Sequence, residues 1–140
     1  MPNTPPQLMA GGNIYPSRFV MIDASNDFKG LIATTNAKTV GVSDVGTNYA
    51  PLSDQTVSEY AAKAGQNLRL FGDGDICLIE SGAVIVRGNE LKADSVGRAT
   101  PIATTGTTNQ RIGAVAIQSA SAAGEFILCQ VRSAIINYST

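Results

Sequence analysis

The sequence RFVMIDASNDFKGLIATTN at residues 18–36 consists of two short apolar runs with turn-forming residues between them. The first run, 18–23, contains β-branched side chains, and the cluster Ser25-Asn26-Asp27 follows it. The second run, 29–34, is again short and mostly apolar. Short runs of this kind, separated by Asn, Asp and Ser, are typical of a β-hairpin. The segment therefore predicts two antiparallel strands joined by a short connection.

The same alternation continues along the rest of the chain. Further strands are predicted at 39–43, 68–71, 75–80, 83–87, 90–93, 98–102, 111–118 and 125–133. Residues 54–63, with Ser53 as an N-cap and Gly65 beyond the end, carry the signals of one short helix. A parallel α/β sheet needs helices between most of its strands, and they are missing here. The many turns and the 14 glycines favour a small barrel or sandwich, so the predicted fold is mainly β with one short helix.

A near-repeat relates the two halves of the chain. The tetrapeptide IATT occurs at 32–35 and again at 102–105, an offset of 102 − 32 = 70 in 140 residues. Its flanks partly agree: 20–23 aligns with 91–94 upstream, and TVGV at 39–42 aligns with RIGA at 111–114 downstream. Two similar hairpin units forming two sides of one barrel would explain this pattern. Unrelated Thr-rich strands that meet the same local requirement would explain it equally well, and both explanations stay open.

Residues 1–16 differ in composition from the rest of the chain. They hold four of the six prolines together with Gly11 and Gly12, and they contain few large apolar side chains. Proline and glycine at this density favour an extended segment outside a packed core. We therefore predict an extended Pro-rich arm at 1–16, which reaches outward to a partner, and a single β-rich domain at 17–140.

Charge and hydropathy exclude several classes of partner. The formal net charge is −1 and the pI is about 5.2, without the basic excess that binding to a phosphate backbone requires, so nucleic acid is not expected as a partner. The longest apolar stretches, such as 76–79 and 113–117, are much shorter than a membrane span. The amino terminus lacks the basic and apolar pattern of a secretory signal, so the protein is expected to remain where it is made.

The residues that most catalytic and metal sites use are scarce. The absence of histidine removes Ser-His-Asp and Cys-His arrangements. Cys77 and Cys129 form no zinc motif and are expected to be free buried thiols, with a disulfide left open in case their strands are neighbours. Asp73 and Asp75, followed by Glu80, suggest a calcium loop, but the glycine and terminal glutamate of the helix-loop-helix pattern are missing. A turn into the following strand is the favoured interpretation.

No catalytic residue, metal ligand or cofactor is therefore predicted, and the chain is not expected to be an enzyme. The fragment Gly72-x-Gly74 lacks the third glycine and the following helix of a phosphate-binding fingerprint. A paired-carboxylate active site stays open, although nothing singles out one pair. The aromatic residues are dispersed and are interpreted as core or interface positions. They are Phe19, Phe28, Tyr49, Tyr60, Phe71 and Phe126.

Three segments, taken in this order, resemble a family of small tailed-phage proteins. They are GDICLIESG at 74–82, LKADSVGRATP at 91–101 and RIGAVA at 111–116. The likeness also takes in GNIYP at 12–16 and GTNY at 46–49, so it covers most of the chain. The members of this family with assigned roles are capsid decoration proteins, also called cement proteins.

The resemblance implies a small β-barrel or β-tulip domain on the outer surface of the mature phage head, usually as a homotrimer. There it would bind the major capsid protein after the shell has expanded and stabilise contacts between neighbouring capsid subunits. The protein would be made in the host bacterial cytoplasm and end in the virion. An extended arm can add a strand to the exposed sheet edge of a partner. The expected capsid or subunit contacts are Pro2, Asn3, Thr4, Pro5, Pro6, Gln7, Leu8, Asn13, Ile14, Tyr15 and Pro16.

Two other functions stay open from the sequence. A different structural part of the virion, such as a head-fibre base or a small tail component, would share the β-rich and charge-poor composition. A hydrolase or metal-dependent enzyme that uses carboxylates alone would reveal itself by an ion bound at Asp73 and Asp75.

Overall fold

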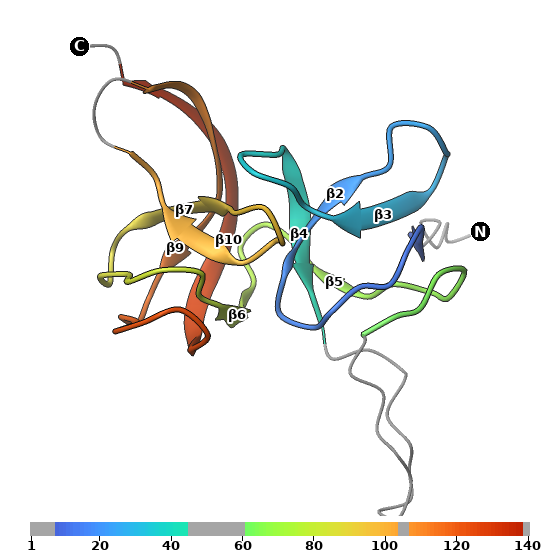
Figure 1. Ribbon diagram of the computed structural model, residues 1–140, viewed down its shortest axis with the longest axis horizontal. Coiled ribbons are helices and arrows are strands. Elements are labelled where there is room, and N and C mark those ends of the chain that lie inside the picture. The colour runs from blue at the N-terminus through green and yellow to red at the C-terminus, as the bar shows by residue number, and fades with distance from the viewer. Residues whose placement is uncertain (1–7, 45–60, 104–106, 139–140) are drawn as a thin grey trace, which may run out of the picture.

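The computed structural model describes residues 8–44, 61–103 and 107–138, which form two β-sheets lying beside each other (Figure 1). These residues contain strands and turns but no helix, which confirms the mainly β fold. Accordingly, the described part of the chain holds no helix long and apolar enough to cross a membrane. The predicted helix at 54–63 lies outside these residues up to position 60. At its C-terminal end, Ala62 instead forms a β-bridge with Ile14.

The first sheet contains the hairpin predicted from residues 18–36. Its strand order is β1-β3-β2-β4-β5, and β1 lies parallel to β3 while the other neighbours are antiparallel. Val20 pairs with Ile32 in the predicted hairpin. The strands are β1 (Met9–Ala10), β2 (Phe19–Ile22), β3 (Lys29–Ile32), β4 (Thr39–Ser43) and β5 (Leu70–Phe71).

The second sheet is antiparallel and strongly curled. Its strand order is β6-β10-β9-β7-β8, and the long strands β9 and β10 bend along their length (Figure 1). A bridge between Ser81 and Ala99 brings the end of β6 to β8, so the sheet forms part of a barrel. The predicted strand at 83–87 is reduced to one bridge between Ile85 and Ala120. The strands are β6 (Ile76–Glu80), β7 (Glu90–Ala93), β8 (Ala99–Pro101), β9 (Thr107–Ala116) and β10 (Phe126–Tyr138).

The near-repeat in the sequence corresponds to the same three-strand arrangement in both sheets. In the first sheet the hairpin β2–β3 is followed by β4, which pairs with the free side of β2. In the second sheet the hairpin β7–β8 is followed by β9, which pairs with the free side of β7. Gly41 of β4 and Gly113 of β9, aligned in the sequence, both stand where a Cβ would clash with neighbouring atoms. The two units thus lie in different sheets and do not form two sides of one barrel.

One hydrophobic core joins the two sheets, and a smaller one lies under the amino-terminal segment. In the larger core, Phe19 and Val42 of the first sheet meet Ile79, Leu91 and Ile127 of the second. All five side chains are buried, so folding removes a continuous apolar surface from water. The smaller core is formed by Ala10, Ile14, Val20, Ala62 and Leu68.

The structure differs from the sequence prediction in residues 8–16, which were assigned to an arm outside the packed core. Ala10 and Ile14 are fully buried, and the N–H of Gly11 donates to the Gly30 carbonyl oxygen at 2.9 Å. The segment is extended, as expected, but it is paired with strand β3 and the turn at Ala62. Small apolar residues between prolines and glycines are sufficient here because the neighbouring segments supply both hydrogen bonds and contacts. Residues 1–7 of the predicted arm lie outside the described part of the chain.

The two sheets meet where Phe19 contacts Gly97 and Gly113. The N–H of Phe19 donates to the Gly97 carbonyl oxygen at 2.8 Å, and Gly97 has φ +81. A Cβ on Gly97 would lie 2.9 Å from Ile32 Cγ2 and 3.0 Å from the Phe19 carbonyl oxygen. A Cβ on Gly113 would lie 2.6 Å from Phe19 Cε1. Glycine is therefore required at both positions for the sheets to approach this closely.

An ion-pair network crosses the same junction. Arg18, directly before β2, donates from Nη2 to Glu80 Oε1 at 3.1 Å, and both side chains are less than a fifth exposed (14% and 18%). Its Nη1 also donates to the Val96 carbonyl oxygen at 2.9 Å. Arg98 lies 4.0 Å from the second oxygen of Glu80 and 3.2 Å from Asp94. Because Arg18 satisfies groups on two elements of the second sheet, the pair fixes how the sheets are oriented.

The substitution Gly97→Ala is expected to lower the free energy of unfolding by about 2–4 kcal/mol, because backbone strain adds to the clash with Phe19 and Ile32. Gly74→Ala is the matched control. Gly74 also has a positive φ, +91, but a Cβ there would meet nothing within 4 Å, so only the strain of about 1–2 kcal/mol remains. Urea unfolding of both variants measures the difference. Equal losses would show that the close approach at Gly97 is not limiting.

Candidate functional site

The carboxylates that suggested chemistry form turns in the structure. Asp75 accepts a hydrogen bond from the N–H of Gly72 at 2.9 Å, directly before β6. Asp23 accepts from the N–H of Ser25 and from Asn26 Nδ2, and these bonds lower the pKa of Asp23 below its usual value. Among the described residues, no three His, Cys, Asp or Glu side chains gather as a metal site would require. The carboxylates therefore serve local backbone geometry.

Asp94 and Glu125 stabilise two further turns in the same way. Oδ1 of Asp94 accepts from the N–H groups of Val96 and Arg98, at 2.9 and 2.8 Å. Glu125 accepts from the hydroxyl and the N–H of Ser121, which lowers the pKa of the Glu125 carboxyl. Both carboxylates thus favour the ionised form at neutral pH, and neither is placed to act as a general acid.

Cys77 and Cys129 face each other across β6 and β10. They are paired in register, both are buried, and their Sγ atoms are 3.9 Å apart. Both are free thiols, as the sequence favoured, and they are neighbours. The hydrogen bond to Cys77, together with burial, raises the pKa of the Cys129 thiol. Since the thiolate is the reactive form, Cys129 stays protonated and is a poor nucleophile.

The most unusual surface of the described structure is an apolar patch on the outside of the second sheet, which we call the outer apolar face. Leu78 pairs with Leu128 at its centre. Ile76 is 58% exposed and Phe126 54% exposed, although both lie in strands. The N–H of Ile117 donates to the Leu128 carbonyl oxygen, which continues the patch toward β9. The outer apolar face consists of Ile76, Leu78, Val115, Ile117, Phe126 and Leu128.

The sequence of these strands explains why the patch exists. An antiparallel sheet with one solvated face normally alternates apolar and polar residues. Here β6 begins ICLI, β10 begins FILC, and GAVAI at 113–117 runs through the end of β9, so apolar side chains lie on both sides of the sheet. The inner set, with Cys77, Ile79 and Ile127, fills the core, and the outer set has no cover among the described residues. Contiguous exposed apolar surface of this kind marks a site of protein contact.

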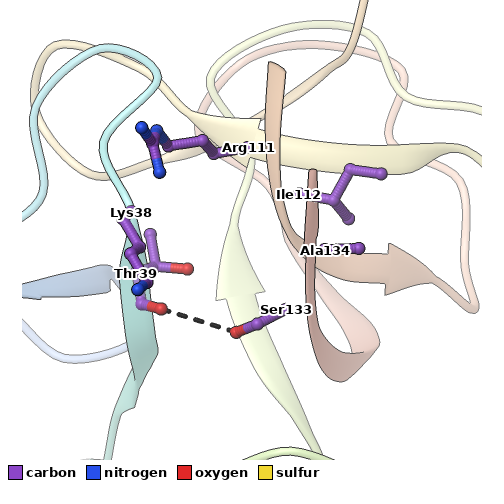
Figure 2. A pocket seen from close by; sticks show the side chains of 6 residues that line it. All are labelled: Lys38, Thr39, Arg111, Ile112, Ser133 and Ala134. Carbon is purple, nitrogen blue, oxygen red and sulfur yellow. Dashed lines mark hydrogen bonds between the residues drawn. The ribbon is translucent and has the colours of Figure 1, made fainter. Parts of the chain in front are cut away.

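A second feature is a recess at the junction of the two sheets, with a volume of about 320 Å³. Figure 2 shows Lys38 and Thr39 from β4 and the residue before it on one side, and Ile112 and Ala134 on the other. The remaining lining residues are Arg111 and Ser133. The Ser133 hydroxyl donates to the Thr39 carbonyl oxygen at 3.4 Å.

The contact residues expected in the arm lie in different environments. Of the predicted set, Leu8 and Asn13–Pro16 fall within the described residues, and Pro2–Gln7 do not. Ile14 is fully buried, so its side chain is not available to a partner in this conformation. The ring of Tyr15 lies under the Arg18 guanidinium, 4.9 Å from ring centroid to Cζ. Asn13 is exposed, and its Oδ1 accepts from the N–H of Ala64 at 3.3 Å.

Phe28, between β2 and β3, is an exposed aromatic residue in a strained conformation. It is 59% exposed and has φ +61, a region that bulky residues rarely adopt. Its carbonyl oxygen accepts from the N–H of Met9 at 2.7 Å, and Met9 is itself partly exposed. Strain of this kind is commonly found at functional sites. The sequence analysis grouped Phe28 with other dispersed aromatic residues, and its position after a turn cluster was the signal that separated it from the core.

No family model matches this chain, and no curated protein matches it at a significant level. Among solved structures it is similar to the crystal structure of the head fiber gp8.5 N base in bacteriophage phi29, with a TM-score of 0.61. The match covers 94% of this chain and 96% of that one, at 14% sequence identity. At this identity the match shows a shared fold, and it extends over nearly the whole of both chains.

The substitution Phe28→Gly is expected to raise the free energy of unfolding by about 0.5–1 kcal/mol, because glycine adopts a positive φ without strain and the exposed ring contributes little packing. Thermal unfolding should show a melting temperature a few degrees higher. Phe28→Ala, which keeps the Cβ and the strain, is the control and should not gain stability. A destabilised glycine variant would mean that the ring packs within the domain and is not held ready for a partner.

Proposed function

We propose that this chain is a structural protein of a tailed-phage virion that binds the outer surface of the head as a capsid decoration protein. The observation that carries the proposal is the similarity, over nearly the full length of both chains, to the base of a phage head fibre. The sequence motifs that resemble decoration proteins support the same class of function. The proposal assigns the chain no enzymatic activity, nucleic acid or membrane as a partner.

The surfaces of the domain support a role based on protein contacts. The outer apolar face lies on the second sheet, whereas Phe28 and Met9 lie at the β2–β3 hairpin and β1, on the side of the first sheet away from the second (Figure 1). Two separated contact regions suit a protein that binds both its own copies and another protein. In this proposal the outer apolar face holds a homotrimer together, and the region of Met9 and Phe28, with the preceding arm, binds the major capsid protein.

Decoration would stabilise the head by thermodynamic linkage. A protein that binds the expanded shell and not the dissociated subunits stabilises the shell by its binding free energy at every occupied site. Individually weak contacts are then sufficient because they are repeated over the whole lattice. The similarity to a head-fibre base favours a second candidate: the domain anchors a fibre on the head without stabilising it.

Head binding is tested by sedimenting the purified protein with expanded heads of its own phage that lack it. Decoration predicts saturable binding in a fixed ratio to the major capsid protein and heads that resist higher temperatures. Saturable binding without added heat resistance would favour a fibre base. No binding would contradict both.

Two variants locate the contact in that assay. Deletion of residues 2–7 and the substitution Phe28→Ala are each expected to weaken head binding, with Val84→Ala, at an exposed valine near the second sheet, as the control. Removal of residues 1–16 is unsuitable because it takes away the buried Ala10 and Ile14. If both variants bind as tightly as the unaltered chain, the arm side of the domain is not the capsid contact.

Self-association is tested by sedimentation equilibrium. The unaltered protein is expected to have the mass of a trimer, and Leu78→Lys to have the mass of a monomer, because a charge in a desolvated apolar interface is strongly unfavourable. Val96→Lys, at an exposed valine in the turn between β7 and β8, is the matched control and should remain trimeric. A monomeric parent protein, or a trimeric Leu78→Lys variant, would exclude the outer apolar face as the self-contact.

A further inference from the structure

The recess of Figure 2 has an apolar wall and a cationic side. Ile112 is buried and Ala134 is partly buried, while Lys38 is exposed and Arg111 is half-buried. Figure 2 shows the Arg111 guanidinium directed toward the side from which Lys38 arises. Two positive side chains thus border the same space of about 320 Å³.

Neither cation is neutralised by an acidic side chain within the described residues. The ion pairs there are formed by Arg18, Glu80, Asp94 and Arg98, all at the other junction of the sheets. The backbone N–H of Arg111 is held by Asn36 Oδ1 at 2.9 Å, which fixes the strand but leaves the guanidinium donors to the recess. A half-buried guanidinium beside an ammonium gains strongly from a carboxylate, because the low-dielectric wall strengthens charge-assisted hydrogen bonds.

Irregular strand pairing shapes the recess on both sides. The pairing of β10 with β9 shifts between Val131 and Ala134, which places Ser133 in the irregular segment. The pairing of β2 with β4 shifts between Val20 and Met21, beside Thr39. Such bulges bend a strand and redirect its side chains. Here they separate the backbones of β4 and β10, and Ser133 and Thr39 are left to bridge the base of the recess with one hydrogen bond.

We propose that this recess is a docking site for the carboxylate side chain of a Glu or Asp residue on a partner protein. Arg111 binds the carboxylate through its planar pair of N–H donors, Lys38 supplies a second positive charge, and the methylene groups of the acidic side chain lie against Ile112 and Ala134. The volume admits one such side chain but is at the lower limit for a drug-sized ligand. The assignment is independent of whether that partner is a capsid subunit.

The test uses the full-length protein and a small probe, N-acetyl-glutamate N-methylamide. Two-dimensional NMR of the uniformly labelled protein should show saturable shifts of the Arg111 Nε–H and of the Ile112 and Ala134 amides. The glutamine analogue of the probe, which has the same shape and no charge, should produce no saturable shift. Arg111→Gln is expected to weaken binding at least tenfold and Lys38→Gln about threefold, while Arg69→Gln, at an exposed arginine outside the recess, should bind as the parent does.

Three results would overturn the proposal. Equal binding of the glutamine analogue would show that charge does not matter, and unchanged binding by Arg111→Gln would place the probe elsewhere. Tighter binding of inorganic phosphate, added as a competitor, would show a general anion site and not one fitted to an acidic side chain. Because Arg111 is half-buried, the melting temperature of each variant is measured first, and Arg111→Lys, which keeps the charge, distinguishes lost binding from lost folding.

Discussion

The approach of Phe19 to Gly97 is the contact on which the relation between the two sheets depends. Phe19 begins β2, donates its N–H to the second sheet through Gly97, and accepts from the N–H of Ala33 with its own carbonyl oxygen. Its ring packs against Gly113 of β9, and the preceding residue, Arg18, forms the ion pair with Glu80. Two consecutive residues therefore hold a hairpin, a turn and two strands of the other sheet in one arrangement. The apolar core can close only while this backbone contact is short.

The motifs that suggested a phage family are, in the structure, positions that this junction requires. In GRA at 97–99, Gly97 allows the close approach, and Asp94 holds the turn that presents it. In RIGA at 111–114, Gly113 makes room for the Phe19 ring. Gly82, in the first motif, lies where a Cβ would collide with the Asp94 carboxylate. The resemblance therefore reflects constraints of the fold, and it is consistent with a shared fold at 14% identity.

Function, in contrast, follows from surfaces that the fold does not need. The outer apolar face lowers the solubility of an isolated chain, and the strained Phe28 costs free energy, so each is best explained by a contact that is gained on assembly. The recess at Arg111 is different because its two cations are stable in water and gain only from a specific carboxylate. Together they describe a domain that binds proteins through three chemically distinct surfaces.

The sequence by itself determined the mainly β class, the hairpin at 18–36, most of the strands and the turn character of Asp75, because period-2 patterns and turn residues act locally. It also left the pairing of Cys77 and Cys129 open, and their contact follows only from the register of β6 and β10. Residues 8–16 were misjudged as outside the core because the partners that bury Ala10 and Ile14 lie at 30 and 62 along the chain. The outer apolar face could be recognised as two-sided apolar strands, but which side would be left uncovered could not be. Only the tertiary structure decided that, and only it brought Lys38 and Arg111 to one recess, because both depend on the curl of the second sheet and its junction with the first.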